Sequence, residues 1–253
     1  MNDKELVAYA ALDYVENNSI VGLGTGSTAD IFIKMLAEKI SNESLNISVV
    51  ASSVISQKKA NDAKLNYISI DQVTSIDLYV DGADEITQDL EILKGRGFDL
   101  IREKLLAQMS EKFIVIGDNS KIVSKIGQNY SIPIEITPIA WKITKSLVEK
   151  IAKKCVVREN MEKNAFAISS YGNFVLDCEF NYSNLDDLAR DIANIPGVFE
   201  HGLFLKLASL AIIANLDIFN NKPCSKTPGV LAISFSRIFK SVYKNSQSST
   251  KFP

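Results

Sequence analysis

The 253-residue chain is poor in the residues that build metal centres and nucleophilic triads: it has one histidine, His201, and three cysteines. Cys155, Cys178 and Cys224 form no CxxC pair and have no histidine cluster beside them, which predicts neither a zinc site nor a disulfide framework. Three free thiols are typical of a reducing compartment. A single histidine leaves one base for Ser-His-Asp or Cys-His catalysis, and no GxSxG motif accompanies it. We expect His201 in a turn or at the surface.

An excess of positive charge is also missing, because 28 Lys and Arg residues stand against 30 Asp and Glu residues. Proteins that bind nucleic acid usually show a basic face or a high pI, so nucleic acid is not an expected partner. No apolar run is long enough to span a bilayer, and the N-terminus has no signal-peptide pattern. These absences predict a cytoplasmic protein with no membrane contact. The composition, 46% hydrophobic and 23% charged, is that of an ordinary globular protein.

Short apolar segments alternate with helical patterns through the first half of the chain. Strands are expected at 19–23, 47–50, 67–70, 76–80 and 113–116, and helices at 4–16, 28–40, 56–65 and 100–109. Ser27 is expected to cap the second of these helices. Such alternation predicts an α/β fold with a parallel sheet that helices cover on both faces.

The pattern changes near Gln128. A helix at 139–153, short strands around Val156, Phe166 and Phe174, and a helix at 184–193 predict a small α+β unit inserted into the first domain, with 207–214 returning as a strand of the first sheet. We therefore expect a Rossmann-like domain of residues 1–127 plus about 201–217 and a small α+β domain of residues 128–200.

The last segment, residues 218–253, carries six Lys or Arg residues and no Asp or Glu. We expect a basic C-terminal extension that is solvated, with an anion or membrane-surface role as the alternative. Its final residues, 244–253, are polar and without periodicity. Their removal is expected to change neither the melting temperature nor turnover.

A glycine-rich loop, Gly22-Leu23-Gly24-Thr25-Gly26-Ser27-Thr28-Ala29, lies between the first expected strand and a helix. Glycines let a backbone approach an anion, and amides at a helix N-terminus can bind it, so the loop indicates a phosphate cradle. The spacing also fits a dinucleotide fingerprint, but Ala51-Ser52-Ser53 stands where that motif needs an acidic residue. A plain tight turn is the remaining alternative.

Charged residues follow other expected strands. Asp81-Gly82-Ala83-Asp84-Glu85 comes after strand 76–80, at the edge where open α/β sheets bind ligands. Its carboxylates would also suit Mg²⁺, although no Walker lysine motif is present. Lys94-Gly95-Arg96-Gly97 offers a cation to an oxyanion, and Lys121 offers another after strand 113–116. Glu103 and Lys104, taken alone, would also fit a charged helix surface.

Taken in order, these motifs resemble the ribose-5-phosphate isomerase type A family over about residues 4–216. The matching segments are GLGTGSTA (22–29), YVDGADEI (79–86), LKGRG (93–97), LIREKLLA (100–107), Ser120-Lys121, PIEI (133–136), and IPGV followed by HGLF. The resemblance implies an enzyme of the non-oxidative pentose phosphate pathway that interconverts D-ribose 5-phosphate and D-ribulose 5-phosphate. It also implies no metal or organic cofactor, and a homodimer or homotetramer.

The resemblance assigns a role to each matching residue. Glu103 would carry the proton between C2 and C1, Lys94 would stabilise the enediolate, and Asp81 and Asp84 would contact the sugar and open its ring. Substrate-binding positions would be Thr25, Gly26, Ser27, Thr28, Asp81, Gly82, Ala83, Asp84, Lys94, Gly95, Arg96, Gly97 and Lys121, with Lys4 as a candidate phosphate contact. An aldose-ketose isomerisation needs a carboxylate base and a cation for the oxyanion, which suits these residue types.

Two departures from the family pattern and two other function classes stay open. Arg96, Phe98 and Asp99 stand where the family usually has glycine and alanine, which would narrow or reshape the loop, and Ala214-Asn215 replaces an expected Gly-Thr. A sugar-phosphate sensing domain would normally carry a helix-turn-helix module, for which we expect no room here. An acyl-CoA transferase-like enzyme would use its glutamate as a nucleophile and would need a larger acyl-carrier site.

Overall fold

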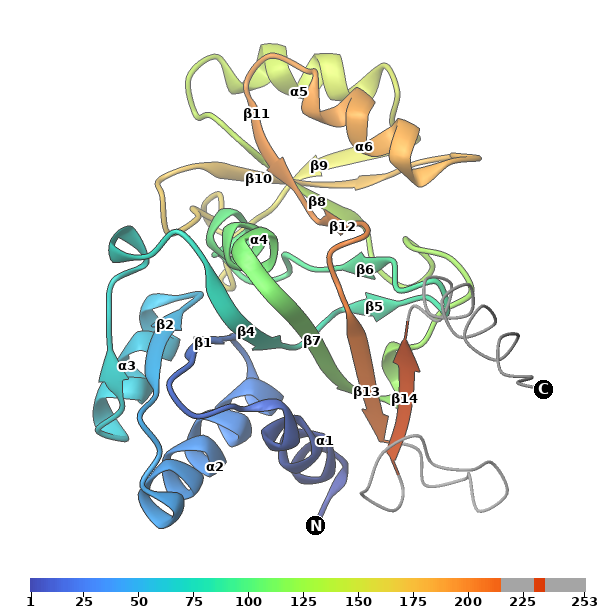
Figure 1. The fold of residues 1–253 in the computed structure, drawn as a ribbon. Helices are drawn as coiled ribbons and strands as arrows, with labels where there is room; N and C mark the ends of the chain where they lie inside the picture. The colour runs from blue at the N-terminus through green and yellow to red at the C-terminus, as the bar shows by residue number, and fades with distance from the viewer. Residues whose placement is uncertain (215–229, 235–253) are drawn as a thin grey trace, which may run out of the picture.

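A seven-stranded sheet forms the centre of the computed structural model, which describes residues 1–214 and 230–234 (Figure 1). Its strand order is β14-β13-β7-β4-β1-β2-β3; β14 is antiparallel to β13, and the other neighbours are parallel. The strands are β1 (Ile20–Leu23), β2 (Ser48–Ala51), β3 (Asn66–Tyr67), β4 (Ile76–Asp81), β7 (Ser110–Asp118), β13 (Leu210–Ala214) and β14 (Val230–Ser234). The expected return of 207–214 to the first sheet is therefore confirmed, with β13 beside β7.

Both faces of this sheet are covered, which explains why its strands are almost continuously apolar. In β7, Ile114 and Ile116 pack with α1 and α2, whereas Phe113 and Val115 pack on the other face with α4. The helices of this part are α1 (Asp3–Ala11), α2 (Ser27–Glu43), α3 (Val54–Asp62) and α4 (Leu100–Met109), with short 3-10 turns at Leu12–Tyr14, Ile70–Gln72 and Asn119–Lys121. The predicted α/β class is confirmed.

A second, antiparallel sheet of order β11-β8-β10-β9 lies in the upper part of Figure 1 with α5 and α6. Its elements are β8 (Ile132–Ile136), α5 (Trp141–Glu149), β9 (Lys154–Val157), β10 (Phe174–Glu179), α6 (Leu185–Ala193) and β11 (Val198–His201). A separate core forms here, in which Cys155 is buried and Trp141 packs against it. The boundaries 1–127 plus about 201–217 and 128–200 stay a prediction, although this sheet falls between β7 and β13 in the chain.

A third, three-stranded sheet connects the two larger ones. It consists of β5 (Glu85–Ile86), β6 (Ile92–Leu93) and β12 (Leu203–Phe204) in the order β12-β6-β5. Because β5 and β6 flank the turn between the Asp81 and Lys94 motifs, this sheet brings those motifs together. Lys94 follows β6 directly, and its amide donates to the carbonyl oxygen of Gly202 at 3.0 Å.

Three local predictions were wrong. The strand expected around Phe166 is only an isolated bridge to Glu159. Ser27 does not cap α2, because Gly26 with its φ of +116° occupies the N-cap position and Ser27 is already helical. His201 is neither in a turn nor at the surface: it ends β11 and is 8% exposed. Burial and the neighbouring Lys104 ammonium lower the pKa of His201 to about 4. The imidazole is therefore neutral at neutral pH.

The predictions for the C-terminal segment are only partly covered by the structure. Residues 230–234 of the expected extension form β14 and pair with β13. Cys224 and the segment 244–253, whose removal we expect to be harmless, lie outside the described residues. Among the described residues, no helix is long and apolar enough to cross a membrane.

Candidate active site

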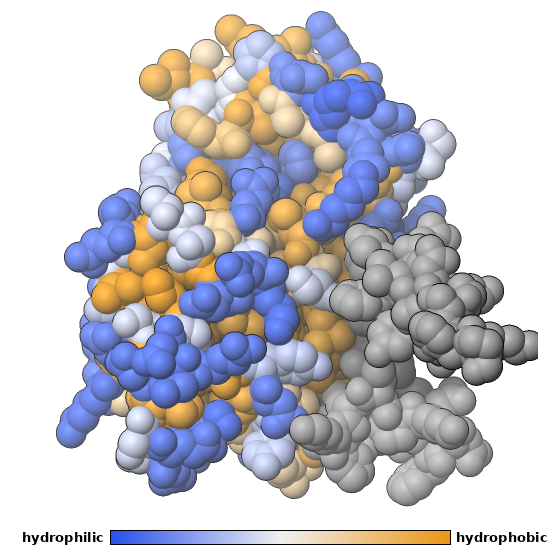
Figure 2. Space-filling view, viewed as in Figure 1, coloured by the Kyte–Doolittle hydropathy of each residue, from blue (hydrophilic) through white to orange (hydrophobic). Residues whose placement is uncertain are grey.

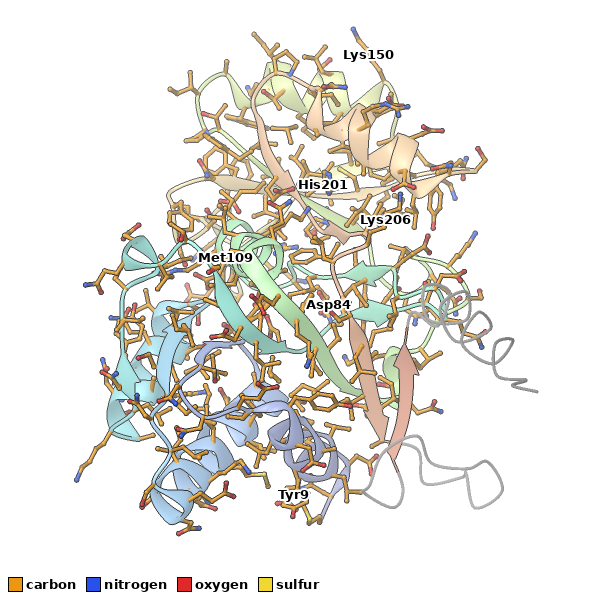
Figure 3. All side chains as sticks on the ribbon, viewed as in Figure 1. Tyr9, Asp84, Met109, Lys150, His201 and Lys206 are labelled. Carbon is orange, nitrogen blue, oxygen red and sulfur yellow. The ribbon has the colours of Figure 1, made fainter. Side chains whose placement is uncertain are left out.

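A pocket of about 270 Å³ opens at the carboxyl ends of β1, β4 and β7. This is the edge where ligands bind in open α/β sheets. Asp84, labelled in Figure 3, lies in it between β4 and β5. Of the residues proposed from the sequence, the pocket is lined by Thr25, Gly26, Ser27, Thr28, Gly82, Ala83, Asp84, Lys94, Gly95, Arg96, Gly97, Glu103 and Lys121. The structure thus brings together residues that are up to a hundred positions apart, with Ala29, Ile116, Gly117 and Asp118 as further lining residues.

Asp81 lies under this pocket, fully buried, and ties the two loops above it together. Its Oδ1 atom accepts hydrogen bonds from the amides of Thr25, at 3.0 Å, and Gly82, at 2.7 Å. The Oδ2 atom accepts from the Tyr79 hydroxyl and from Lys94 Nζ, the latter at 2.8 Å. A Cβ at Gly24 would lie 2.2 Å from Asp81 Oδ1, so only glycine lets the β1 loop approach this carboxylate.

Lys94 places its ammonium at the centre of the acidic residues. Its Nζ atom lies 2.8 Å from Asp81 Oδ2 and 3.5 Å from Glu103 Oε2, and it donates to the Gly82 carbonyl oxygen at 2.9 Å. Burial alone would lower the pKa of Lys94, but the carboxylates of Asp81 and Glu103 outweigh burial and raise that pKa above its usual range. Lys94 is therefore a permanent cation facing the pocket.

Glu103 is held in the first turn of α4, and its side chain is buried rather than on the charged helix surface that its neighbours suggested. Burial raises the pKa of Glu103 to about 7, with Lys94 opposing the shift and Asp81 adding to it. Its Oε2 atom has no hydrogen-bond partner among the described residues. A carboxylate at a pocket wall, with a pKa near neutrality and an oxygen that faces the Lys94 ammonium without a hydrogen bond, is suited to taking up and returning a proton.

Asp84 and Arg96 form the opposite wall. Burial raises the pKa of Asp84. The Lys94 ammonium and the hydrogen bond from the Arg96 amide oppose this rise. The Arg96 amide donates to Asp84 Oδ2 at 3.3 Å, while the Arg96 guanidinium lies over the Tyr130 ring, 4.0 Å from its centroid. The arginine that departs from the family pattern is thus exposed, stacks on Tyr130 and lines the pocket.

The other end of the pocket is the N-terminus of α2. Amides in a first helical turn and the positive end of the helix dipole favour an anion there. Lys4 Nζ donates to Ser27 Oγ at 2.8 Å, and Lys121 lines the same pocket, so two ammonium groups accompany the amides. Residues 25–28 and Lys121 line the pocket here, and Lys4, which does not line it, contacts Ser27; together they form a cationic cradle.

Several supporting residues were missed by sequence analysis. Thr25 Oγ1 lies within 3.0 Å of three serine hydroxyls, those of Ser52, Ser53 and Ser56, and Ser56 Oγ donates to the Gly24 carbonyl oxygen at 2.6 Å. These hydroxyls fix the positions of Thr25 and Gly24, and with them the loop that forms the cradle. The sequence did contain a signal for these residues: Ser52 and Ser53 stand where a dinucleotide-binding site would have its acidic residue, at the end of the second strand.

Two of the three carboxylates after β4, for which the sequence had also allowed a magnesium site, are engaged within the protein. Glu85 is fully buried and accepts hydrogen bonds from the amides of Gly127, Asn129 and Tyr130 at 2.6, 2.5 and 3.0 Å. Asp81 is committed to Lys94 and the loop amides. Within residues 1–214 and 230–234, no group of three His, Cys, Asp or Glu side chains could hold a metal ion.

The fold and this site together define an α/β enzyme of the aldose-ketose isomerase class, in which a carboxylate moves a proton beside a fixed cation. The family model described as ribose 5-phosphate isomerase A (phosphoriboisomerase A) matches residues 48–217. The chain belongs to the ribose-5-phosphate isomerase A family.

Individual relatives agree with this assignment over most of their lengths. Ribose-5-phosphate isomerase A of Prochlorococcus marinus (strain MIT 9312) is 36% identical over 228 residues, 89% of this chain and 95% of the relative. The protein of that name from Sinorhizobium medicae is 38% identical over 212 residues, 82% of this chain and 91% of the relative.

Solved structures of the family have the same fold. A D-ribose-5-phosphate isomerase in complex with phospho-erythronic acid superimposes with a TM-score of 0.84 at 33% identity, over 92% of this chain and all of its own. Ribose 5-phosphate isomerase A of Methanocaldococcus jannaschii gives a TM-score of 0.81 at 30% identity, over 91% of this chain and 97% of its own.

Proposed function

We propose that this protein interconverts D-ribose 5-phosphate and D-ribulose 5-phosphate, a reaction of the non-oxidative pentose phosphate pathway, with Glu103 as the base. The observation that carries the proposal is the Glu103 carboxylate, whose pKa lies at about 7 and whose Oε2 atom is 3.5 Å from the Lys94 ammonium. Membership of the ribose-5-phosphate isomerase A family supports the same reaction.

In the proposed mechanism, the cradle of residues 25–28 holds the phosphate, and the sugar extends toward Glu103. Asp84 contacts the sugar hydroxyls and assists opening of the furanose ring. Glu103 then removes the proton from C2; the C2–H electron pair forms the C1–C2 double bond of an enediolate, and the C1–O double-bond pair moves onto O1. The same carboxyl returns the proton to C1 while the proton of O2 passes to O1 and the C2–O double bond forms. Lys94 stabilises the negative oxygen that develops, because a buried ammonium already in place needs no reorganisation.

The decisive experiment is a direct assay of pentose isomerisation with ribose 5-phosphate, run before and after extensive dialysis against a chelator. We expect ketopentose phosphate to form at an unchanged rate after dialysis, because Lys94 and Lys121 supply the cations that a metal would otherwise provide. Loss of activity that magnesium restores would contradict metal independence. Binding of the sugar phosphate without turnover would instead indicate a sensing domain.

The phosphate cradle predicts a strong preference for the phosphorylated sugar. Free ribose should react with a kcat/KM at least about 100-fold lower than ribose 5-phosphate, since losing two hydrogen bonds to a charged group costs roughly 1.5 kcal/mol each. Ser27→Leu should raise KM for ribose 5-phosphate more than it lowers kcat, because it obstructs the anion site and leaves Glu103 in place. Equal efficiency on the two sugars would contradict the cradle.

We further propose that the enzyme is a homodimer or homotetramer in the cytoplasm that contacts neither nucleic acid nor a membrane. The small number of cysteines and the lack of a CxxC pair in the sequence support a reducing compartment. Hydrophobic residues reach the surface over the small sheet and its helices (Figure 2), among them Ile139, Ile143 and Phe199, which are 79%, 65% and 59% exposed. Exposed hydrophobic side chains of this kind support an interface in which they are buried against a second copy of the chain. A solution mass of 27.9 kDa would contradict self-association.

A further inference from the structure

Arg158 reaches from the small sheet to the glycine loop of the active site. The residue directly follows β9, and its guanidinium forms a two-pronged ion pair with Asp177 of β10, with Nε–Oδ2 at 2.9 Å and Nη2–Oδ1 at 2.6 Å. The remaining nitrogen, Nη1, donates to the carbonyl oxygens of Gly95 and Gly97, both at 3.0 Å. The side chain is 13% exposed. Because a guanidinium is planar and its donors are fixed, Asp177 determines where Nη1 can point.

One peptide group of the loop is held from both of its ends. The Gly95 carbonyl, which Arg158 binds, belongs to the same peptide group as the Arg96 amide, which donates to Asp84 Oδ2 at 3.3 Å. In a planar trans peptide the carbonyl and the amide point in opposite directions. Rotation of this peptide would therefore break the bonds to Arg158 and to Asp84 together. The guanidinium on one side and the pocket carboxylate on the other are linked through a single rigid plane.

The loop needs such an external support. Gly95 has a φ of +99°, and a Cβ there would lie 2.9 Å from Leu100 Cδ1. Glycine is thus required at this position, yet glycines give a backbone the largest conformational freedom. The loop starts at Lys94, whose ammonium has to stay between Asp81 and Glu103. The amide of Ser170, also from the small unit, holds the far end of the loop by donating to the Phe98 carbonyl oxygen at 2.9 Å.

We propose that Arg158 is a positioning residue for the isomerisation. It does not itself line the pocket; it binds the pocket wall from behind, at the Gly95 and Gly97 carbonyl oxygens. In this way it fixes the Gly95-Arg96 peptide that orients Asp84 and the loop that carries Lys94. The small antiparallel unit thereby takes part in catalysis through one side chain. This inference rests on the proposed function, because it assigns a role within the same site.

The test is the Arg158→Met variant, which keeps an unbranched side chain to about the position of Nε and removes every donor. We expect kcat for ribose 5-phosphate to fall by about 10-fold to 100-fold, since a catalytic group displaced by about 1 Å can cost that much. KM should change by less than about 3-fold, because the phosphate cradle has no contact with Arg158. A residue that only fastened β9 to β10 would lower the melting temperature and leave kcat unchanged at temperatures where the protein is folded.

Lys154→Met is the matched control. Lys154 lies on the same strand and pairs with Glu179 across the same two strands, at 3.5 Å, but it lines no part of the pocket. This variant should keep the wild-type kcat. If Arg158→Met does not fold, the Asp177→Asn variant tests the proposal instead. It keeps the Arg158 guanidinium but removes the carboxylate that orients it. The expected fall in kcat is smaller than for Arg158→Met.

The outcomes separate this inference from the proposed function. A wild-type protein that does not isomerise ribose 5-phosphate would contradict the function itself. An active wild type together with a folded Arg158→Met or Asp177→Asn variant of unchanged kcat would overturn the positioning role alone. A loss of kcat in Lys154→Met equal to that in Arg158→Met would also overturn it, because any broken cross-strand ion pair would then have the same effect.

Discussion

Glu103→Gln is expected to lower kcat for ribose 5-phosphate at least about 100-fold, the lower range for loss of a general base. Glutamine nearly preserves the shape of the side chain but cannot accept the C2 proton. Binding should persist, because the phosphate end of the pocket is formed by residues 25–28 and not by α4. The effect should therefore appear in kcat and hardly in the affinity for a ligand.

Three measurements check this expectation. Steady-state kinetics give kcat, and calorimetry with phospho-erythronic acid, the ligand of one solved relative, gives the affinity. The wild-type kcat/KM should fall as the pH drops below about 7, because protonation of Glu103 removes the base. The pH profile of the Glu103→Gln variant should not show this fall. Glu111→Gln, at an exposed glutamate of β7, is the matched control and should behave as wild type. Near-normal turnover by Glu103→Gln would exclude Glu103 as the base.

Lys94→Met is expected to damage both catalysis and stability. Turnover should fall by about 10²- to 10³-fold, the usual cost of removing one preorganised group that stabilises an oxyanion. The melting temperature should fall as well, because Asp81 is fully buried and loses its ammonium partner. Breaking a buried ion pair from one side costs roughly 3–5 kcal/mol.

A double variant separates these two effects. Asp81→Asn combined with Lys94→Met removes the uncompensated charge, so it should recover much of the melting temperature lost in Lys94→Met while turnover stays low. Thermal unfolding and kinetics on the wild type, both single variants and the double variant complete the cycle. A Lys94→Met protein with the stability and turnover of wild type would show that the buried pair carries neither role.

The parallel sheet and part of the pocket could be predicted because they follow from local patterns. The apolar segment 76–80 predicted a buried strand, and the carboxyl ends of parallel strands meet at one edge, which gathered the glycine loop, Asp84 and Lys121. Lys94 reaches the same pocket from β6 of the small three-stranded sheet, and Glu103 was assigned to it only by the family resemblance. Burial of polar residues could not be predicted in the same way. Lys104 is buried because its ammonium donates to the His201 carbonyl oxygen at 2.6 Å and to Glu200 at 2.7 Å, partners almost a hundred positions away.

The same reason explains why Arg158 and Ser56 escaped sequence analysis. Arg158 binds the backbone carbonyl of Gly95, and Ser56 binds that of Gly24. Every residue has a backbone carbonyl oxygen, so the residue types do not show which carbonyl a distant side chain binds. The misplaced cap at Ser27 has a different origin. A serine before an apolar helix usually caps it, but here Gly26 takes that position and the hydroxyl accepts from Lys4.

The place of β13 beside β7 also determines the order in which the nascent chain can be completed. The two strands are parallel and separated by all residues between Asp118 and Leu210, so no hairpin can join them. During synthesis that side of β7 has no partner until Leu210–Ala214 has left the ribosome, whereas the antiparallel strands β8 to β11 are made earlier and pair among themselves. An apolar edge left open for so long is prone to pair with other chains. Folding of the small unit before β13 is made would bury part of the apolar surface that such pairing needs.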